Sequence, residues 1–220
     1  MFPIRIAGPP MPDRASPSIS SRKQPQQARS AGLVATILEA AVQVLAKEGA
    51  ARFTTARVAE KAGVSVGSLY QYFPNKAAIL FRLQSDEWRQ TADMLRAILE
   101  DRARPPLDRV RTLVHAFLKS ECDEAAMRVA LDDAAPLYRD APEAKTARAS
   151  ADGVVAAFMR EAVPNATDAV RAMAGDLLKT TMSQVGKHYS ETQRTDAEIS
   201  AYADAMADMF CAYLRSLDHA

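Results

Sequence analysis

Apolar positions in the first half of the chain recur at helical spacing and are interrupted by glycine. From Ala31 they recur every three to four residues until the sequence KEGA, where Gly49 predicts a helix end. A second, short helix is expected after a cap at Thr54 or Thr55, and it ends at Gly63. The pattern therefore predicts a long helix followed by a short one.

The next segment, VSVGSLYQYFPNK at residues 64–76, is rich in β-branched and aromatic residues that favour a strand. A strand here would have no neighbour to pair with, and isolated strands are unstable. Ser65 is instead a good N-cap for a helix that begins near Val66 and ends before Pro74. Two short helices joined by a glycine-containing turn and packed on a longer one form a helix-turn-helix unit, whose last helix enters the major groove of DNA.

Helical periodicity continues through the rest of the chain. A helix of some 25 residues is expected from about Asn75 to Asp101, and shorter ones follow at about 107–122, 123–135, 143–163, 168–188 and 196–217. Only 8 glycines and 6% aromatic residues, beside abundant Ala, Leu, Arg and Glu, also favour helices. The expected fold class is all-α.

Composition and charge divide the chain into parts. Residues 1–28 hold half of the 12 prolines and are predicted to be a disordered basic arm, which either contacts DNA or stays a solvated tail. Residues 1–80 carry 10 Lys and Arg against 4 Asp and Glu, whereas residues 81–220 carry 18 against 23. This polarity indicates that the N-terminal part meets a polyanion. The predicted domains are the arm, a DNA-binding domain at 29–76, and a helical domain at 77–220.

The stretch ILEAAVQVLAKEGAARFTTARVAEKAGVSVGSLYQYFPNKAAIL, within residues 31–83, resembles the tetracycline-repressor (TetR) family of bacterial transcription regulators. An ordered series carries the resemblance: T-T, then A-x-x-A-G-V, then G-S-L-Y-x-Y-F-x-N-K-x-x-L. It implies a homodimer with an N-terminal three-helix, homeodomain-like DNA-binding domain. It also implies that 77–220 is an effector-binding and dimerisation domain, in which a small molecule changes the separation of the two recognition helices.

The resemblance also implies two sets of DNA contacts. Positions that match backbone contacts are Thr54, Thr55, Ser65, Tyr70, Tyr72 and Lys76, and positions that match base-edge contacts are Val66, Gly67, Ser68 and Gln71. The residue chemistry agrees in part, because Lys76 offers a charge to a phosphate and Gln71 can pair with an adenine. Packing remains the alternative for Tyr70 and Tyr72, and Gly67 is either a DNA-facing residue or a requirement of helix packing.

The C-terminal helices supply candidates for a ligand pocket and a dimer interface. The pocket candidates are Trp88, Met94, Leu113, His115, Phe117, Met127, Tyr138 and Phe158, with core packing as the alternative. The last two helices carry wide apolar stripes that need cover from a partner. The interface candidates are Val170, Met173, Leu177, Thr181, Tyr202, Met206, Met209, Phe210 and Tyr213, with closure of the monomer core as the alternative.

Other functional classes find little support in the sequence. His115, His188 and His219 do not fall at metal-ligand spacing, and no glycine-rich phosphate loop or G-x-S-x-G motif occurs, so neither an enzyme nor a bound cofactor or metal is expected. Cys122 and Cys211 are too few for a disulfide framework. No signal peptide or membrane-length apolar run is expected, which favours the cytoplasm.

The sequence therefore predicts a DNA-binding transcriptional regulator, more often a repressor, that a small-molecule effector releases from a palindromic operator. Two alternatives remain open. One is an effector-independent DNA-binding or architectural protein, and the other is a ligand-binding protein whose DNA-binding module is vestigial.

Overall fold

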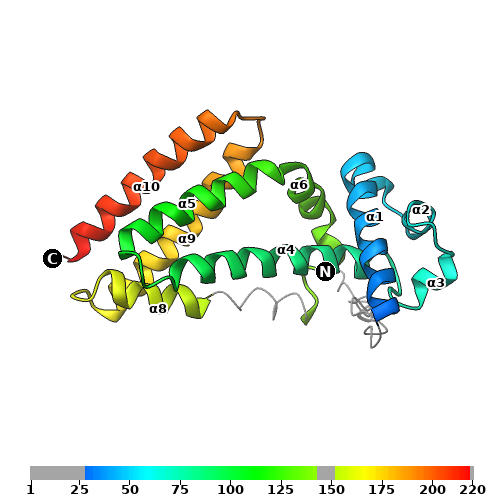
Figure 1. The fold of residues 1–220 in the computed structure, drawn as a ribbon, viewed down its shortest axis with the longest axis horizontal. Coiled ribbons are helices and arrows are strands. Elements are labelled where there is room, and N and C mark those ends of the chain that lie inside the picture. The colour runs from blue at the N-terminus through cyan, green and yellow to red at the C-terminus, as the bar shows by residue number, and fades with distance from the viewer. Residues whose placement is uncertain (1–27, 143–151, 219–220) are drawn as a thin grey trace, which may run out of the picture.

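The computed structural model describes residues 28–142 and 152–218, and every regular element in these two ranges is a helix. The predicted arm, except for Ala28, lies outside the described residues, as do His219 and the first part of the helix expected at 143–163. The all-α prediction is confirmed, with a small helical unit at one end and a larger helical domain at the other (Figure 1).

The small unit consists of α1 (Ala28–Arg52), α2 (Thr55–Lys61) and α3 (Val66–Tyr70). The helical path of α1 breaks at Gly49, whose φ of 73° is accessible to glycine, as the predicted helix end requires. Gly63, with a φ of 67°, makes the turn between α2 and α3. Each predicted boundary of the helix-turn-helix unit therefore has a local backbone cause.

Helix α1 corrects one expectation about membranes. By length and composition alone, Ser30–Arg52 is apolar enough to cross a bilayer, whereas no such run was expected. In the fold its inner face, with Ile37, Ala41 and Leu45 fully buried, packs against the helices that follow it. The high apolar content of α1 is thus used for the core of the small unit.

The larger domain is built from the remaining helices. They are α4 (Lys76–Leu99), α5 (Pro106–Asp123), α6 (Ala125–Ala134), the 3₁₀ turn η1 (Ala135–Leu137), α8 (Asp152–Ala162), α9 (Asp168–Ser190) and α10 (Asp196–Asp218). Helix α4 begins in the small unit and runs along the whole length of the large domain (Figure 1). It therefore connects the two parts as a single rigid element.

The buried hydrophobic residues of the described ranges form two separate cores. The first joins α1, α2 and α3 to the start of α4 and to α6, and the second fills the space among α4, α5, α8, α9 and α10. Helix α6 packs mainly on α1. The small unit is consequently held by two elements of the large domain, α4 and α6.

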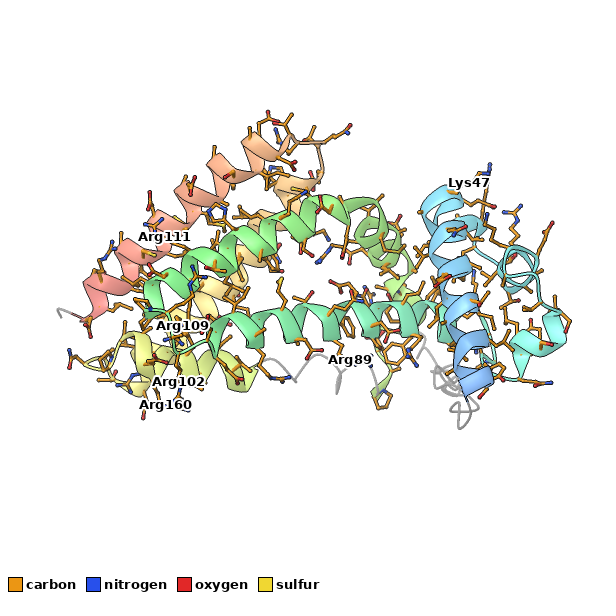
Figure 2. All side chains as sticks on the ribbon, viewed as in Figure 1. Lys47, Arg89, Arg102, Arg109, Arg111 and Arg160 are labelled. Atoms are coloured by element: carbon orange, nitrogen blue, oxygen red, sulfur yellow. The ribbon has the colours of Figure 1, made fainter. Side chains whose placement is uncertain are left out.

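Helix α5 is the centre of the large domain, with α9 and α10 both packed along it. Two ion pairs and a hydrogen bond line its contact with α10. The ion pairs are Arg111 with Asp208 and Lys119 Nζ with Asp196 Oδ1 at 3.1 Å, and the hydrogen bond joins His115 Nε2 and Asp204 Oδ1 at 3.0 Å. Figure 2 shows Arg111 on α5, on the side of α10. The outer seam between these helices is therefore polar.

A buried arginine ties the far end of the domain together (Figure 2). Arg109 of α5 is 1% exposed, donates a hydrogen bond from one terminal nitrogen to the Leu99 carbonyl at 2.6 Å, and pairs with Glu161 of α8 through the other. Its guanidinium also lies over the Phe158 ring. Arg109 thus links α4, α5 and α8 at the end opposite α1.

Candidate DNA-binding surface and ligand cavity

Two of the predicted DNA contacts are helix caps. The Thr54 hydroxyl accepts a hydrogen bond from the Arg57 amide at 3.3 Å and caps α2, and the Ser65 hydroxyl accepts one from the Ser68 amide at 3.0 Å and caps α3. Both side chains remain exposed. Free N–H groups at helix starts attract anions, so these positions are suited to phosphate contacts.

A hydrogen bond brings α2 and α3 together on the same surface. The hydroxyls of Thr55 and Tyr70, 15 residues apart, are 3.1 Å from each other. Tyr70 and Val66 each expose 40% of their surface, and Gln71 at the end of α3 is also exposed. An aromatic ring, a β-branched side chain and an amide are therefore presented together by α3 and the residue that follows it.

Gly67 lies between these exposed side chains, and the structure excludes one reading of it. A Cβ added at this position would meet only the Ser65 Oγ, at 3.8 Å, which is ordinary van der Waals contact. Helix packing therefore does not require glycine here, and the packing alternative for Gly67 is wrong. Gly67 lies on the exposed surface of α3.

For Tyr72, in contrast to Gly67, the structure favours the packing alternative. Only 7% of this residue is exposed, and it belongs to the core that joins the small unit to α4 and α6. The chain leaves the helix after Tyr70, so Tyr72 does not share the direction of its neighbour. We therefore assign Tyr72 to packing and not to the phosphate-facing set.

The start of α4 completes this surface. The Asn75 side chain accepts a hydrogen bond from the Ala78 amide at 2.9 Å and caps the helix, and Lys76 is its first residue. Lys76 is half-buried. A positive charge beside unpaired N–H groups is suited to a phosphate.

The large domain holds a cavity of about 380 Å³ between α4, α5, α6 and α9. Its lining residues are Gln84, Glu87, Trp88, Thr91, Ala92 and Leu95 from α4, Phe117 and Glu121 from α5, Ala125, Arg128, Val129 and Asp132 from α6, and Ser183, Lys187 and Ser190 from α9, with Glu191 directly after it. This volume lies within the range typical of small-molecule sites.

A polar network centred on Arg128 forms one wall of the cavity. One terminal nitrogen of Arg128 faces both Glu87, with its Oε1 at 2.9 Å, and Glu121, and the other donates to the Ser120 Oγ at 3.0 Å. The Nε of Arg128 is buried and has no hydrogen-bond partner in the described part of the chain. The network therefore joins α6 to both α4 and α5.

The network also extends toward the DNA-binding end. Gln84 donates a hydrogen bond to the Glu87 Oε2 at 2.8 Å. The single proton of the Tyr138 hydroxyl is shared between two acceptors, the Gln84 Oε1 at 3.2 Å and the Leu131 carbonyl at 3.0 Å. Tyr138 belongs to the first core, together with α1. Polar contacts thus connect the cavity wall with the packing of the DNA-binding domain.

Burial perturbs the acidic groups of this network. Desolvation raises the pKa of Glu87 and of Glu121 above the ordinary value, although the nearby Arg128 acts in the opposite direction. Like-charge repulsion adds to this effect, because Glu124 raises the pKa of Glu87, and Glu87 and Glu124 both raise the pKa of Glu121. One guanidinium therefore does not fully compensate the buried negative charge.

The predicted pocket residues divide into two groups. Trp88 and Phe117 line the cavity, while Leu113 and Phe158 lie around a much smaller apolar void of about 40 Å³ in the second core. The other four do not line either space: His115 pairs with Asp204, Met94 and Met127 are partly buried against the cores, and Tyr138 is a core residue. For these four, neither space supports the pocket assignment, which stays a prediction.

Sequence reasoning missed the charged wall formed by Glu87, Glu121 and Arg128. A signal was present, because Glu121 follows Phe117 and Val114 at spacings of four and seven and thus falls on the buried face of α5. Glu87 likewise lies one turn beyond the buried Leu83 on α4. A charged residue at an apolar position of a helical pattern marks a buried ionic site.

The predicted interface residues also separate. Met173 and Leu177 of α9 and Tyr202 and Met209 of α10 expose between 40% and 57% of their surface, and Val170, Thr181 and Tyr213 are half-buried. Met206 and Phe210, in contrast, are 5% and 3% exposed and pack in the second core, so they are not available to a partner. The apolar residues of α10 therefore lie on two faces of the helix. One face packs in the second core, and the other is exposed.

A three-helix unit with a capped, exposed α3, joined to a larger helical domain that holds a cavity, defines a helix-turn-helix DNA-binding regulator. The chain belongs to the TetR family. The family model described as "Bacterial regulatory proteins, tetR family" matches residues 37–83, and "Tetracyclin repressor-like, C-terminal domain" matches residues 105–217. The resemblance in the sequence is thereby confirmed.

Part of the chain is similar to proteins of known role. The nucleoid occlusion factor SlmA of Vibrio campbellii is 37% identical over 83 residues, which are 37% of this chain and 42% of that protein. The likeness to that relative thus spans less than half of its length.

Solved structures resemble the chain over most of its length. The fatty acid degradation regulator FadR of Bacillus halodurans gives a TM-score of 0.65 at 18% identity, over 86% of this chain and 97% of that one. FadR of Bacillus subtilis in complex with stearoyl-CoA gives 0.63 at 15% identity, over 80% and 97%. At these identities the likeness concerns the fold.

Proposed function

We propose that the chain is a cytoplasmic, homodimeric transcriptional repressor that a small-molecule effector releases from a palindromic operator. The observation that carries the proposal is the course of α4. This helix begins beside the DNA-binding surface with Lys76 and forms one wall of the cavity from Gln84 to Leu95. A ligand that changes the position of α4 therefore changes the position of the DNA-binding surface.

In this proposal, phosphates are contacted by Thr54, Thr55, Ser65, Tyr70 and Lys76. Base edges are contacted by Val66, Gly67, Ser68 and Gln71, with the Gln71 amide placed for an adenine and Val66 for a thymine methyl group. The exposure of Val66, Tyr70 and Gln71 supports these roles. Only Gln71 has a long polar side chain in the base-edge set, so DNA shape contributes to specificity.

The dimer is proposed to form through the outer faces of α9 and α10. Met173, Leu177, Tyr202 and Met209 are large, apolar and exposed, which is unusual for the surface of a monomer. A two-fold arrangement places two copies of α3 for half-sites about 34–36 Å apart, or a multiple of that spacing.

The effector-independent alternative shares the DNA-binding surface but gives no reason for the cavity. Stabilising a buried ionic network beside a cavity is costly, and an architectural protein gains nothing from it. We therefore favour the effector-dependent reading.

Fluorescence anisotropy tests the DNA-binding part of the proposal. The full-length protein is titrated onto DNA from immediately upstream of its own gene, or onto a site from a genome-wide selection, with scrambled competitor and at several salt concentrations. Competitor-resistant binding is expected. Gln71→Ala should weaken binding to the operator more than to scrambled DNA, by roughly 1–3 kcal/mol, because it removes a base contact.

Lys76→Ala serves as the comparison. It should weaken binding to both DNAs alike and reduce the salt slope by about 1, because it removes a phosphate contact. Equal binding of wild-type protein to operator and scrambled DNA would contradict the proposal.

A further inference from the structure

The cavity wall around Arg128 carries more negative than positive charge. Arg128 faces three carboxylates, those of Glu87, Glu121 and Glu124, at 2.9 Å, at hydrogen-bond distance and at 3.4 Å respectively. The side chains of Glu87 and Glu121 are only 13% and 8% exposed. A single guanidinium thus compensates a cluster of carboxylates that has little access to water.

The other charged residues of the cavity do not remove this excess. Lys187 pairs with Asp132 across α9 and α6, and Glu191 lies 3.3 Å from the His188 Nδ1. Asp132 is therefore the main partner of Lys187, and Glu121 is only a weaker electrostatic partner. An additional positive charge in the cavity would be stabilised by Glu87 and Glu121, whereas an added anion would be repelled by them.

The rest of the cavity is suited to an apolar body. Trp88, Leu95, Phe117 and Val129 lie in the same lining as the two carboxylates. Aromatic faces attract cations and also pack against hydrocarbon, and polar groups in such pockets fix the orientation of the ligand. The lining therefore combines an anionic end with an apolar and aromatic remainder.

Arg128 also connects this wall to the DNA-binding end. It lies on α6, whose Leu131 and Ala134 are buried in the first core together with Ile37 of α1. Its contacts with Glu87 and Glu121 hold α6 against α4 and α5. Loss of these contacts removes the ionic anchor of the element that packs on α1.

We propose that the cavity binds a small organic cation with an apolar or aromatic body, and that this cation competes with Arg128 for Glu87 and Glu121. Binding frees Arg128, loosens α6 from α4 and α5, and shifts α1 with the DNA-binding domain. This inference rests on the proposed function, because it names the class of effector and the contacts through which the effector acts.

Binding is tested with three probes of similar size: benzyltrimethylammonium, its neutral analogue neopentylbenzene, and the anion phenylacetate. The chain has a single tryptophan, Trp88, in the cavity lining, so its fluorescence reports on this site. The full-length protein without DNA should show saturable binding of the cation, at least about tenfold tighter than that of the other two probes. Equal binding of cation and neutral analogue, preference for the anion, or no saturation with the cation up to roughly 10 mM overturns the proposal.

Variants then assign the binding to the carboxylates. Glu121→Gln should weaken the cation at least about tenfold and leave the neutral analogue unchanged. Asp133→Asn makes the same change of charge at an exposed position of α6 and should leave both unchanged. If the two variants behave alike, Glu121 does not bind the cation.

Arg128→Gln tests the competition itself. If Arg128 competes with the ligand, its removal should tighten cation binding, with the fold checked by circular dichroism; weaker binding by a folded variant contradicts the competition. Should Arg128→Gln not fold, Arg128→Lys provides the same comparison, since lysine makes fewer contacts with the carboxylates.

The outcomes separate this inference from the proposed function. Anion preference together with operator binding overturns the class of effector and leaves the regulator intact. Cation binding without any operator binding supports the site and contradicts the regulator.

Discussion

At the scale of single residues, two side chains of the same chemistry can face different surroundings because the backbone directs them differently. Tyr70 and Tyr72 are equally plausible DNA contacts in the sequence, yet one is exposed and the other lies in the core. The helix ends between them, so helical periodicity does not predict the direction of Tyr72. Gly67, in contrast, can be assigned to the outer surface because nothing in the fold fills the space beside it.

Gly67→Ala separates stability from DNA binding. The added methyl group has room, and alanine favours a helix over glycine, so the free energy of unfolding should rise by about 0.5–1 kcal/mol. Affinity for the operator should fall, because the proposed function places Gly67 against the base edges, where an added methyl group would stand between α3 and the DNA. Denaturant unfolding and anisotropy measure the two effects, and an unchanged operator affinity would remove Gly67 from the DNA-facing set.

Glu121→Gln gives a pH-dependent effect on stability. The pKa of Glu121 is raised in the folded protein, so its titration contributes stability that is present at low pH and is lost as the pH rises through the folded pKa. Glutamine does not titrate, so the variant does not lose this stability as the pH rises. Its stability relative to wild type should therefore increase from about pH 4 to pH 7, as measured by urea unfolding at each pH. A constant or decreasing difference would indicate that Glu121 is not destabilised by burial.

At the scale of elements, the sequence predicts where the helices begin and end better than it predicts which helices pack against each other. Caps and glycines such as Thr54, Gly63 and Asn75 act locally, so the boundaries of α2 to α4 follow from a few residues. Contacts between helices depend on faces that the sequence does not distinguish. Helix α5 is covered by α4, α9 and α10, which explains why His115 faces α10 and not the cavity.

Gly186 of α9 tests the packing that forms the cavity. A Cβ at this position would lie 2.8 Å from a ring carbon of Phe117 and 3.1 Å from Glu121 Cγ. Gly186→Ala should therefore lower the free energy of unfolding by about 1–3 kcal/mol. Gly153→Ala on α8 is the matched control, because its Cβ meets nothing within 4 Å. If thermal unfolding places both variants at or above the stability of wild type, the approach of α9 to α5 is not close.

At the scale of the whole molecule, the proposed function requires two copies of the chain that act together. The outer faces of α9 and α10 carry large exposed apolar residues, and the DNA-binding surface lies at the other end of α4. The apolar pattern of the sequence predicted exposed apolar faces on these helices but overestimated their width. Met206 and Phe210, which belong to the pattern, are buried in the core. Sequence patterns show that a face is apolar, and only the packing shows whether it is already covered.

Leu177→Glu tests the dimer. Leu177 is 49% exposed in the monomer, so a charge there should leave the fold intact and disrupt association. Sedimentation should give the monomer mass of 23.9 kDa in place of twice that value. Val42→Glu, at an exposed apolar position on α1, should remain dimeric. A dimeric Leu177→Glu variant would place the interface elsewhere.

The most direct test of the central claim compares an intact palindromic operator with the same DNA carrying one scrambled half-site. Anisotropy titrations of the full-length protein should show two chains bound per intact operator and a loss of affinity on scrambling of at least about tenfold. Equal affinity for the two DNAs, with one chain bound to each, would contradict a dimeric regulator that reads its operator through paired α3 helices.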